Sequence, residues 1–118
     1  MAEWALNTFK TVRHVVTNNN VGIYTAPIGV AAIVLFAQAV NIDPDNVRFV
    51  TLIHSRPINP DGGAIDFQII NQGPVIPNDA LNLLNGRLVL ETNDELRCLG
   101  NTTGDVKVVV SILETAKS

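Results

Sequence analysis

The sequence predicts an all-β fold, an antiparallel, jelly-roll-like sandwich of about eight strands with a short N-terminal arm. Three observations predict it. Turn-forming residues recur about every ten positions. The segments between the turns are short and rich in Val, Ile and Leu. Several of these segments alternate at a period of two residues, which is typical of strands that bury one face.

The alternation is clearest in the middle and at the end of the chain. In "VRFVTLIHSR" (47–56), one face carries Val47, Phe49, Thr51 and Ile53. The segment "DVKVVVSILE" (105–114) predicts a long last strand with Val106, Val108, Val110 and Ile112 on one face. Between them, "RLVLE" (87–91), "TND" and "ELRCLG" (95–100) predict a hairpin.

The most apolar stretch, "IYTAPIGVAAIVLFAQAV" (23–40), admits three interpretations. The length of the run argues against a membrane span, because it is shorter than the roughly 20 apolar residues that a bilayer requires. Its alanines suit a helix, and periodicity cannot separate helix from strand over so short a run. The surrounding turns and strands favour a strand that follows the turn "APIG" (26–29).

As a strand, this stretch has two apolar faces, with Val30, Ala32, Val34 and Phe36 on one and Ala31, Ile33, Leu35 and Ala37 on the other. One sheet face of a sandwich normally meets water, so a second apolar face indicates a cover, either another segment of the same chain or another subunit, and self-association is the simplest explanation. The arm over residues 1–10 holds the only tryptophan, which packs either on its own core or on a neighbour. The predicted interface comprises Trp4, Phe9, Ala31, Ile33, Leu35, Ala37, Val109 and Leu113.

Composition sets the remaining limits. A chain of 118 residues with 47% apolar and 16% charged residues is one domain, 1–118, whose low charge also indicates surface covered by a partner. The net charge of −3, with scattered Lys and Arg, argues against nucleic-acid binding. The N-terminus lacks a secretory signal pattern. Cys98 is the only cysteine, so we expect a buried structural thiol and neither an intramolecular disulfide nor a cysteine-based zinc site.

No pattern predicts a catalytic, cofactor or metal site. A Ser-His-Asp hydrolase would have to assemble from His54 with Ser55 or Ser111, without local support. The oxygen-rich loop "NIDPDN" (41–46) could bind calcium, but it lacks EF-hand spacing, and Asx turns are the simpler interpretation. Sugar-binding surfaces usually present exposed Trp or Tyr side chains, and this chain has only Trp4 and Tyr24, so the sequence gives little support for sugar binding.

Three segments, "GIYTAPIGVAAIVLFAQAVN" (22–41), "IPNDALNLLNGRLVLETNDELRCLG" (76–100) and "VKVVVSILE" (106–114), resemble small β-sandwich virion proteins of tailed bacteriophages. The resemblance covers roughly the last hundred residues, in order. It departs from the family pattern over residues 42–75 and in the N-terminal arm, where we expect subunit-specific contacts. It implies scaffold roles for Tyr24, Ala26, Pro27 and Gly29 in a turn, and for Leu84, Gly86, Leu88, Leu90, Glu91 and Asp94 in a hairpin.

The resemblance implies a non-enzymatic structural protein of the virion, assembled in the host cytoplasm. We expect a homo-oligomer, a trimer, that acts as a capsid decoration (cement) protein and clamps the major capsid protein. No nucleic acid, membrane or cofactor is expected as a partner. The alternatives are a neck, collar or tail-surface protein, and a receptor- or sugar-binding fibre module.

Overall fold

The computed structural model describes residues 7–57 and 65–116, and this part of the chain contains nine strands and no helix. Accordingly, none of these residues belongs to a helix that could cross a membrane. The strands are β1 (Asn7–Val15), β2 (Val21–Thr25), β3 (Val30–Asn41), β4 (Arg48–Ser55), β5 (Asp66–Val75), β6 (Ala80–Asn82), β7 (Leu88–Leu90), β8 (Glu95–Gly100) and β9 (Val106–Ala116). The predicted all-β fold is confirmed, and the apolar run over 23–40 comprises the end of β2, the turn at 26–29 and most of β3.

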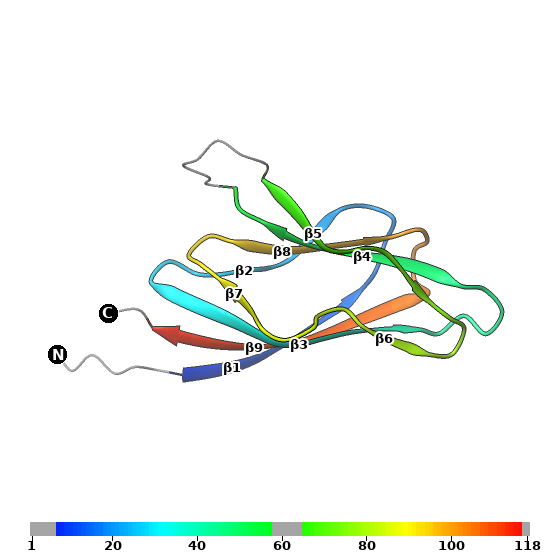
Figure 1. Cartoon of the computed structure of the whole chain (residues 1–118), viewed down its shortest axis with the longest axis horizontal. Coiled ribbons are helices and arrows are strands. Elements are labelled where there is room, and N and C mark those ends of the chain that lie inside the picture. Colours follow the sequence, from blue (N-terminus) through cyan, green and yellow to red (C-terminus); the bar gives the residue numbers. More distant parts are fainter. Residues whose placement is uncertain (1–6, 58–64, 117–118) are drawn as a thin grey trace.

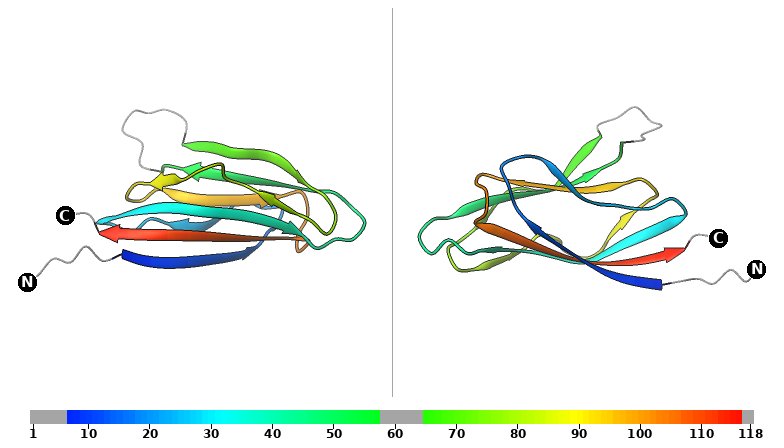
Figure 2. Two further views of the ribbon diagram at one scale, coloured as in Figure 1. Left: turned by 60° about the horizontal axis from the view of Figure 1, so that its bottom comes forward. Right: turned by 180° about the vertical axis from the view of Figure 1, so that it is seen from behind.

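The strands form two antiparallel sheets that pack as the layers of a sandwich (Figures 1 and 2). The five-stranded sheet has the order β1-β9-β3-β6, and β7 pairs with β3 beside β6. The four-stranded sheet has the order β2-β8-β4-β5. If β6 and β7 count as two pieces of one broken edge strand, the eight positions and their order are those of a jelly roll.

This order arises because the chain folds back on itself as a nested ribbon. The β4–β5 hairpin lies at the closed end of the ribbon, β3 pairs with β6 and β7, β2 pairs with β8, and β1 pairs with β9. The inner faces of the two sheets meet in one apolar core. Its largest fully buried side chains include Val16, Val34, Leu52, Leu90, Leu96 and Ile112.

Strand β3 contains a bulge that changes which side chains share a face. The pairing with β9 shifts between Val34 and Phe36, so that two residues of β3 lie opposite Ser111. Beyond the bulge, Ala37 faces the core with 2% exposure and Phe36 points outward. The expected placement of Ala37 on the outer face and of Phe36 on the inner face is therefore wrong, because simple alternation assumes an unbroken ladder.

The predicted hairpin of 87–91 with 95–100 is also wrong. β7 pairs with β3 and β8 pairs with β4, so the two segments belong to different sheets. The turn 91–94 between them crosses the edge of the sandwich. Its backbone bonds to the "APIG" turn, with the Ala26 N–H donating to the Asp94 carbonyl and the Asn93 N–H donating to the Ala26 carbonyl, both at 2.9 Å.

The Asp94 side chain stabilises this crossing. It is 1% exposed, and it accepts hydrogen bonds from His54 Nε2 (2.9 Å), Arg56 Nε (2.9 Å) and the Glu91 N–H (3.0 Å). Burial disfavours the ionised carboxyl, but these donors outweigh it and lower the pKa of Asp94 to about 2. A side chain that the resemblance treats as scaffold thus joins β4, the 91–94 turn and, through its backbone, the turn before β3.

We predict that Asp94→Asn destabilises the fold by about 2–3 kcal/mol, since it removes a buried charge that accepts hydrogen bonds from three residues. Urea unfolding at neutral pH measures the change. Asp45→Asn is the matched control, because Asp45 is exposed in the 41–46 loop, and it should change the free energy of unfolding by less than about 0.5 kcal/mol. Equal effects of the two substitutions would contradict the role assigned to Asp94.

The same carboxyl predicts a loss of stability in acid. Its folded pKa of about 2 lies below the unfolded value of 3.8, so its contribution is complete above about pH 4 and falls as the pH drops from about 4 to about 2. The loss should amount to about 2 kcal/mol. In Asp94→Asn this component is absent, so the stability gap between the two proteins should narrow over this pH range. A gap that stays constant between about pH 6 and about pH 2.5 would count against the prediction.

Candidate functional site

The outward face of the five-stranded sheet carries a continuous apolar row across four strands. Phe9 of β1 lies opposite Leu113 of β9, Leu113 lies opposite Ile33 of β3, and Ile33 lies opposite Val89 of β7. Directly opposite residues share a face of an antiparallel sheet, so these four side chains, here called the apolar row, are neighbours. Phe9 is 73% exposed and Val89 is 55% exposed, and within the described residues no segment covers the row.

The apolar surface extends beyond this row. Phe36 lies one step along the sheet, and Val109, Val40 and Val15 lie farther along the same face, beyond the polar Thr11, Ser111 and Gln38. Single exposed apolar residues are ordinary, but a contiguous patch on a sheet face is typical of an interaction surface. We call the surface formed by these outward apolar residues the outer apolar face. Its members are Phe9, Val15, Ala31, Ile33, Phe36, Val40, Val89, Val109 and Leu113.

One end of the outer apolar face is basic. Arg13 of β1 lies opposite Val109, and Lys107 of β9 lies opposite Val15, so the two cations are diagonal neighbours. Both are exposed, and neither forms an ion pair with another described residue. They border a hollow of about 510 Å³ at the edge of the sheet. A surface that complements this face should therefore be apolar with a carboxylate at one side.

The structure places five of the eight predicted interface residues on the outer apolar face. They are Phe9, Ala31, Ile33, Val109 and Leu113. Leu35 is half-buried within the bulge, Ala37 belongs to the core, and Trp4 lies outside the described residues. The predicted interface did not include Phe36 and Val89, which also belong to the outer apolar face. The alternation in "RLVLE" (87–91), with Val89 between Leu88 and Leu90, could have identified Val89.

Strand β1 is the edge of the sheet and is held by β9 alone. Its first five residues, of which Asn7 to Lys10 belong to the predicted arm, are all exposed, so the opposite sheet does not cover them. Its inward Lys10 forms an ion pair with Glu114 of β9 (Nζ to Oε2, 3.6 Å). Glu114 also accepts a hydrogen bond from the Tyr24 hydroxyl of β2, so it links the two sheets. Burial and this neighbouring carboxylate raise the pKa of Tyr24 above its ordinary range.

The loop at 41–46 forms Asx turns. Asp43 Oδ1 accepts hydrogen bonds from the Asp45 N–H (2.8 Å) and the Asn46 N–H (3.2 Å), and Asp43 Oδ2 accepts from Arg48 Nη2 (2.6 Å). The bonds from the Asp45 backbone, the Asn46 side chain and Arg48 lower the pKa of Asp43 to about 2. Both oxygens of the best candidate ligand are thus engaged by donors, and the described residues hold no group of three or more His, Cys, Asp or Glu that could bind a metal.

The remaining reactive side chains are arranged for stability. Cys98 is fully buried on β8, and burial raises the pKa of its thiol to about 12, so it is a poor nucleophile, as expected. His54 faces Asp94, but the adjacent Ser55 belongs to the opposite side of β4 because neighbouring residues of a strand alternate. His54 and Ser55 therefore do not form a nucleophile–base pair in this arrangement.

The chain is a jelly-roll sandwich in which the outward face of the five-stranded sheet exposes apolar side chains. The chain matches no protein-family model and no curated protein sequence. Among solved structures it is similar to a protein of the Bacillus endospore appendages, a family of disulfide-linked pili. That likeness has a TM-score of 0.53 and 11% identity, and it covers 96% of this chain and 88% of the other.

It is also similar to a protein of the T13 IBDV viral particle, with a TM-score of 0.54 and 10% identity over 94% of this chain. The chain spans 31% of the length of that viral protein. At these identities the likenesses show the fold alone. They establish that the same sandwich occurs in structural proteins of a virus particle and of a spore appendage.

We predict that calcium leaves the thermal stability of the protein unchanged. Because donors already saturate Asp43, about 5 mM CaCl₂ or an equal concentration of EDTA should shift Tm by less than about 1 °C. Asp43→Ala should lower Tm, since it removes the turn that orders the loop and one of the two carboxylate partners of Arg48, the other being Asp105. A rise in Tm with calcium that Asp43→Ala abolishes would contradict the prediction.

Proposed function

We propose that this protein is a structural subunit of a virus-type particle and that the outer apolar face is its assembly surface. The observation that carries the proposal is the apolar row, in which Phe9, Leu113, Ile33 and Val89 form a line across four strands and face solvent. Burial of apolar area is the main favourable term in protein association. A subunit repeated in many copies needs only a modest interface at each contact.

More specifically, we propose that the protein is a capsid decoration protein of a tailed bacteriophage, assembled as a homotrimer on the major capsid protein. The sequence resemblance supports the phage, and the low charge of the chain supports a covered surface. The outer apolar face adds the chemistry of the contact. Its partner surface should present apolar side chains opposite the apolar row and a carboxylate near Arg13 and Lys107. We propose a virion location and no enzymatic activity.

A neck, collar or tail-surface position is compatible with the same chemistry. Copy number separates these positions, because a capsid surface takes hundreds of copies and a neck or tail ring takes only a few. A second candidate function is a subunit of a pilus-like appendage, favoured by the similarity that covers 88% of the endospore appendage protein. Open filaments in electron micrographs of the purified protein would favour this candidate, and closed trimers would favour the virion subunit.

The proposal predicts that charge on the apolar row prevents assembly while leaving the fold intact. Phe9→Asp and Val89→Asp place a carboxylate on highly exposed positions, so folding should be little affected and self-association should weaken about a hundredfold or more. Sedimentation velocity over a concentration series measures the oligomeric state. The capsid decoration role is tested by binding to expanded capsids. The measurements are the copy number per particle and the rise in capsid melting temperature.

Ile76→Asp is the matched control, since Ile76 is 54% exposed but lies after β5, outside the outer apolar face. It should assemble like the parent. A parent protein that is monomeric at all concentrations and binds no particle would overturn the proposal, as would oligomers that survive both Phe9→Asp and Val89→Asp.

A further inference from the structure

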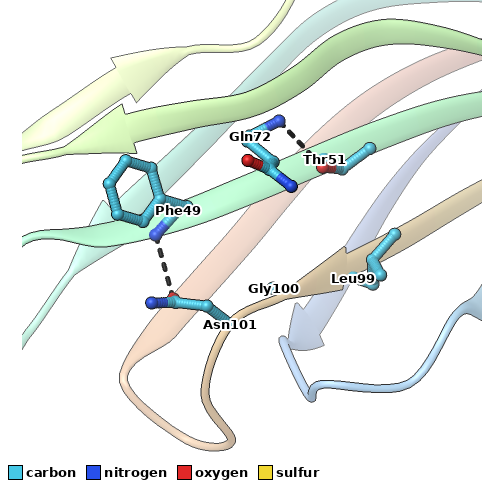
Figure 3. Close-up of a pocket in the computed structure, with 6 residues that line it drawn as sticks. All are labelled: Phe49, Thr51, Gln72, Leu99, Gly100 and Asn101. Atoms are coloured by element: carbon cyan, nitrogen blue, oxygen red, sulfur yellow. Dashed lines mark hydrogen bonds between the residues drawn. The ribbon is translucent and has the colours of Figure 1, made fainter.

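The outward face of the four-stranded sheet has a small pocket on the opposite side of the sandwich from the outer apolar face. Its volume is about 250 Å³, and its lining residues are Phe49, Thr51, Gln72, Leu99, Gly100 and Asn101 (Figure 3). Thr51 of β4 lies opposite Leu99 of β8, so the two share this face. Gln72 belongs to β5, and Asn101 follows β8 directly.

Local hydrogen bonds hold the lining in place and determine which groups it presents. The Phe49 N–H donates to Asn101 Oδ1 (3.0 Å), which leaves the Nδ2 amide hydrogens of Asn101 available to donate. The Gln72 N–H donates to Thr51 Oγ1 (2.9 Å), which leaves the Thr51 hydroxyl hydrogen available. Figure 3 shows the Gln72 side chain lying over β4 between Phe49 and Thr51.

The backbone conformation at Gln72 is typical of a residue beside a binding site. Its φ of 50° lies in the left-handed region, which non-glycine residues seldom adopt. The pairing of β4 with β5 shifts at this point, between Val50 and Leu52. Bulges redirect side chains and are enriched next to functional sites, and rare backbone conformations cluster there too. Here the shift directs a long amide side chain over the pocket.

The chemistry of the lining selects a neutral, polyhydroxylated ligand. None of the six lining residues is ionisable, so the pocket offers nothing to neutralise a charged ligand. Two side-chain amides and a hydroxyl supply both donors and acceptors, and the Phe49 ring, 39% exposed, and Leu99 supply an apolar surface. A sugar ring matches this combination, because its C–H face packs on apolar side chains while its hydroxyls bond to amides.

We propose that this pocket binds a single sugar unit, with Phe49 and Leu99 against the ring and Gln72 and Asn101 on its hydroxyls. The volume lies below the roughly 300–1,000 Å³ of pockets that take drug-sized ligands, which suits one ring. The pocket is open on one side, so a longer glycan can extend into solvent. The inference does not depend on the proposed assembly role, since the two surfaces belong to different sheets.

Titration of the ¹⁵N-labelled full chain tests the proposal. The probes are the methyl glycosides of glucose, galactose and N-acetylglucosamine, each up to about 100 mM, followed by amide shifts. One of the sugars should perturb the amides of Phe49, Gln72, Gly100 and Asn101 with saturation. A second arm uses maltotetraose and chitotetraose. Tighter binding of a tetrasaccharide identifies a polysaccharide as the source, and equal binding identifies a free or terminal sugar.

Substitutions locate the binding. Gln72→Gly removes the amide and suits the positive φ, so the fold should persist while binding weakens about tenfold or more. Asn101→Asp keeps the acceptor for the Phe49 N–H but loses the Nδ2 donor, and it should weaken binding similarly. Gln68→Ala, on the same strand but outside the pocket, is the matched control and should bind like the parent.

The proposal is overturned if no sugar perturbs these amides at the highest concentration. It is also overturned if the perturbed amides lie elsewhere, or if Gln72→Gly and Asn101→Asp, each folded by its amide spectrum, bind as tightly as the parent. Assembly of Phe9→Asp and Val89→Asp is measured separately, so failure of sugar binding and failure of the assembly role remain distinguishable.

Discussion

The sandwich depends on the pairing of β9, the last strand, with β1 and β3, strands from the first third of the chain. β9 lies between them over its full length, and its inward Val106, Val108, Val110 and Ile112 are almost fully buried. Such pairing joins residues that lie between 65 (Asn41 with Val106) and 108 (Asn7 with Thr115) positions apart in the sequence. The loop-closure entropy is therefore compensated only when the whole ribbon has folded. The outer apolar face exists because β1, β9 and β3 are brought side by side.

The crossing at 91–94 is the second constraint. After β7 the chain leaves the five-stranded sheet, and β8 begins the return through the four-stranded sheet. A crossing between layers leaves backbone groups without ladder partners, and here the N–H of Ala26 donates to the Asp94 carbonyl while the carbonyl of Ala26 accepts from the Asn93 N–H. The Asp94 carboxylate adds bonds from His54 of β4 and from Arg56, which follows β4. The turn "APIG" and the turn at 91–94 are therefore one structural unit, although Asn93 and Asp94 lie 67 and 68 positions after Ala26 in the sequence.

The two outward faces of the sandwich have different chemistry. The face of the five-stranded sheet is apolar with a basic end, which suits a protein surface. The face of the four-stranded sheet carries neutral amides beside an aromatic ring, which suits a small polar ligand. Jelly rolls occur in both capsid proteins and lectins, so the fold is compatible with assembly and with sugar binding. The function of each face depends on its side chains.

The sequence by itself determined the all-β class, the turn at 26–29 and the strand that follows it, the core face of the last strand and the buried state of Cys98. These follow from period-two alternation and from turn residues, which are local properties of a few neighbouring residues. Tertiary structure alone decided which strands pair. The bulge moved Ala37 into the core and Phe36 to the surface, and β7 and β8 separated into different layers, because both depend on partners far away in the chain. The pocket beside Gln72 was not predictable for the same reason, since three strands and a register shift assemble it.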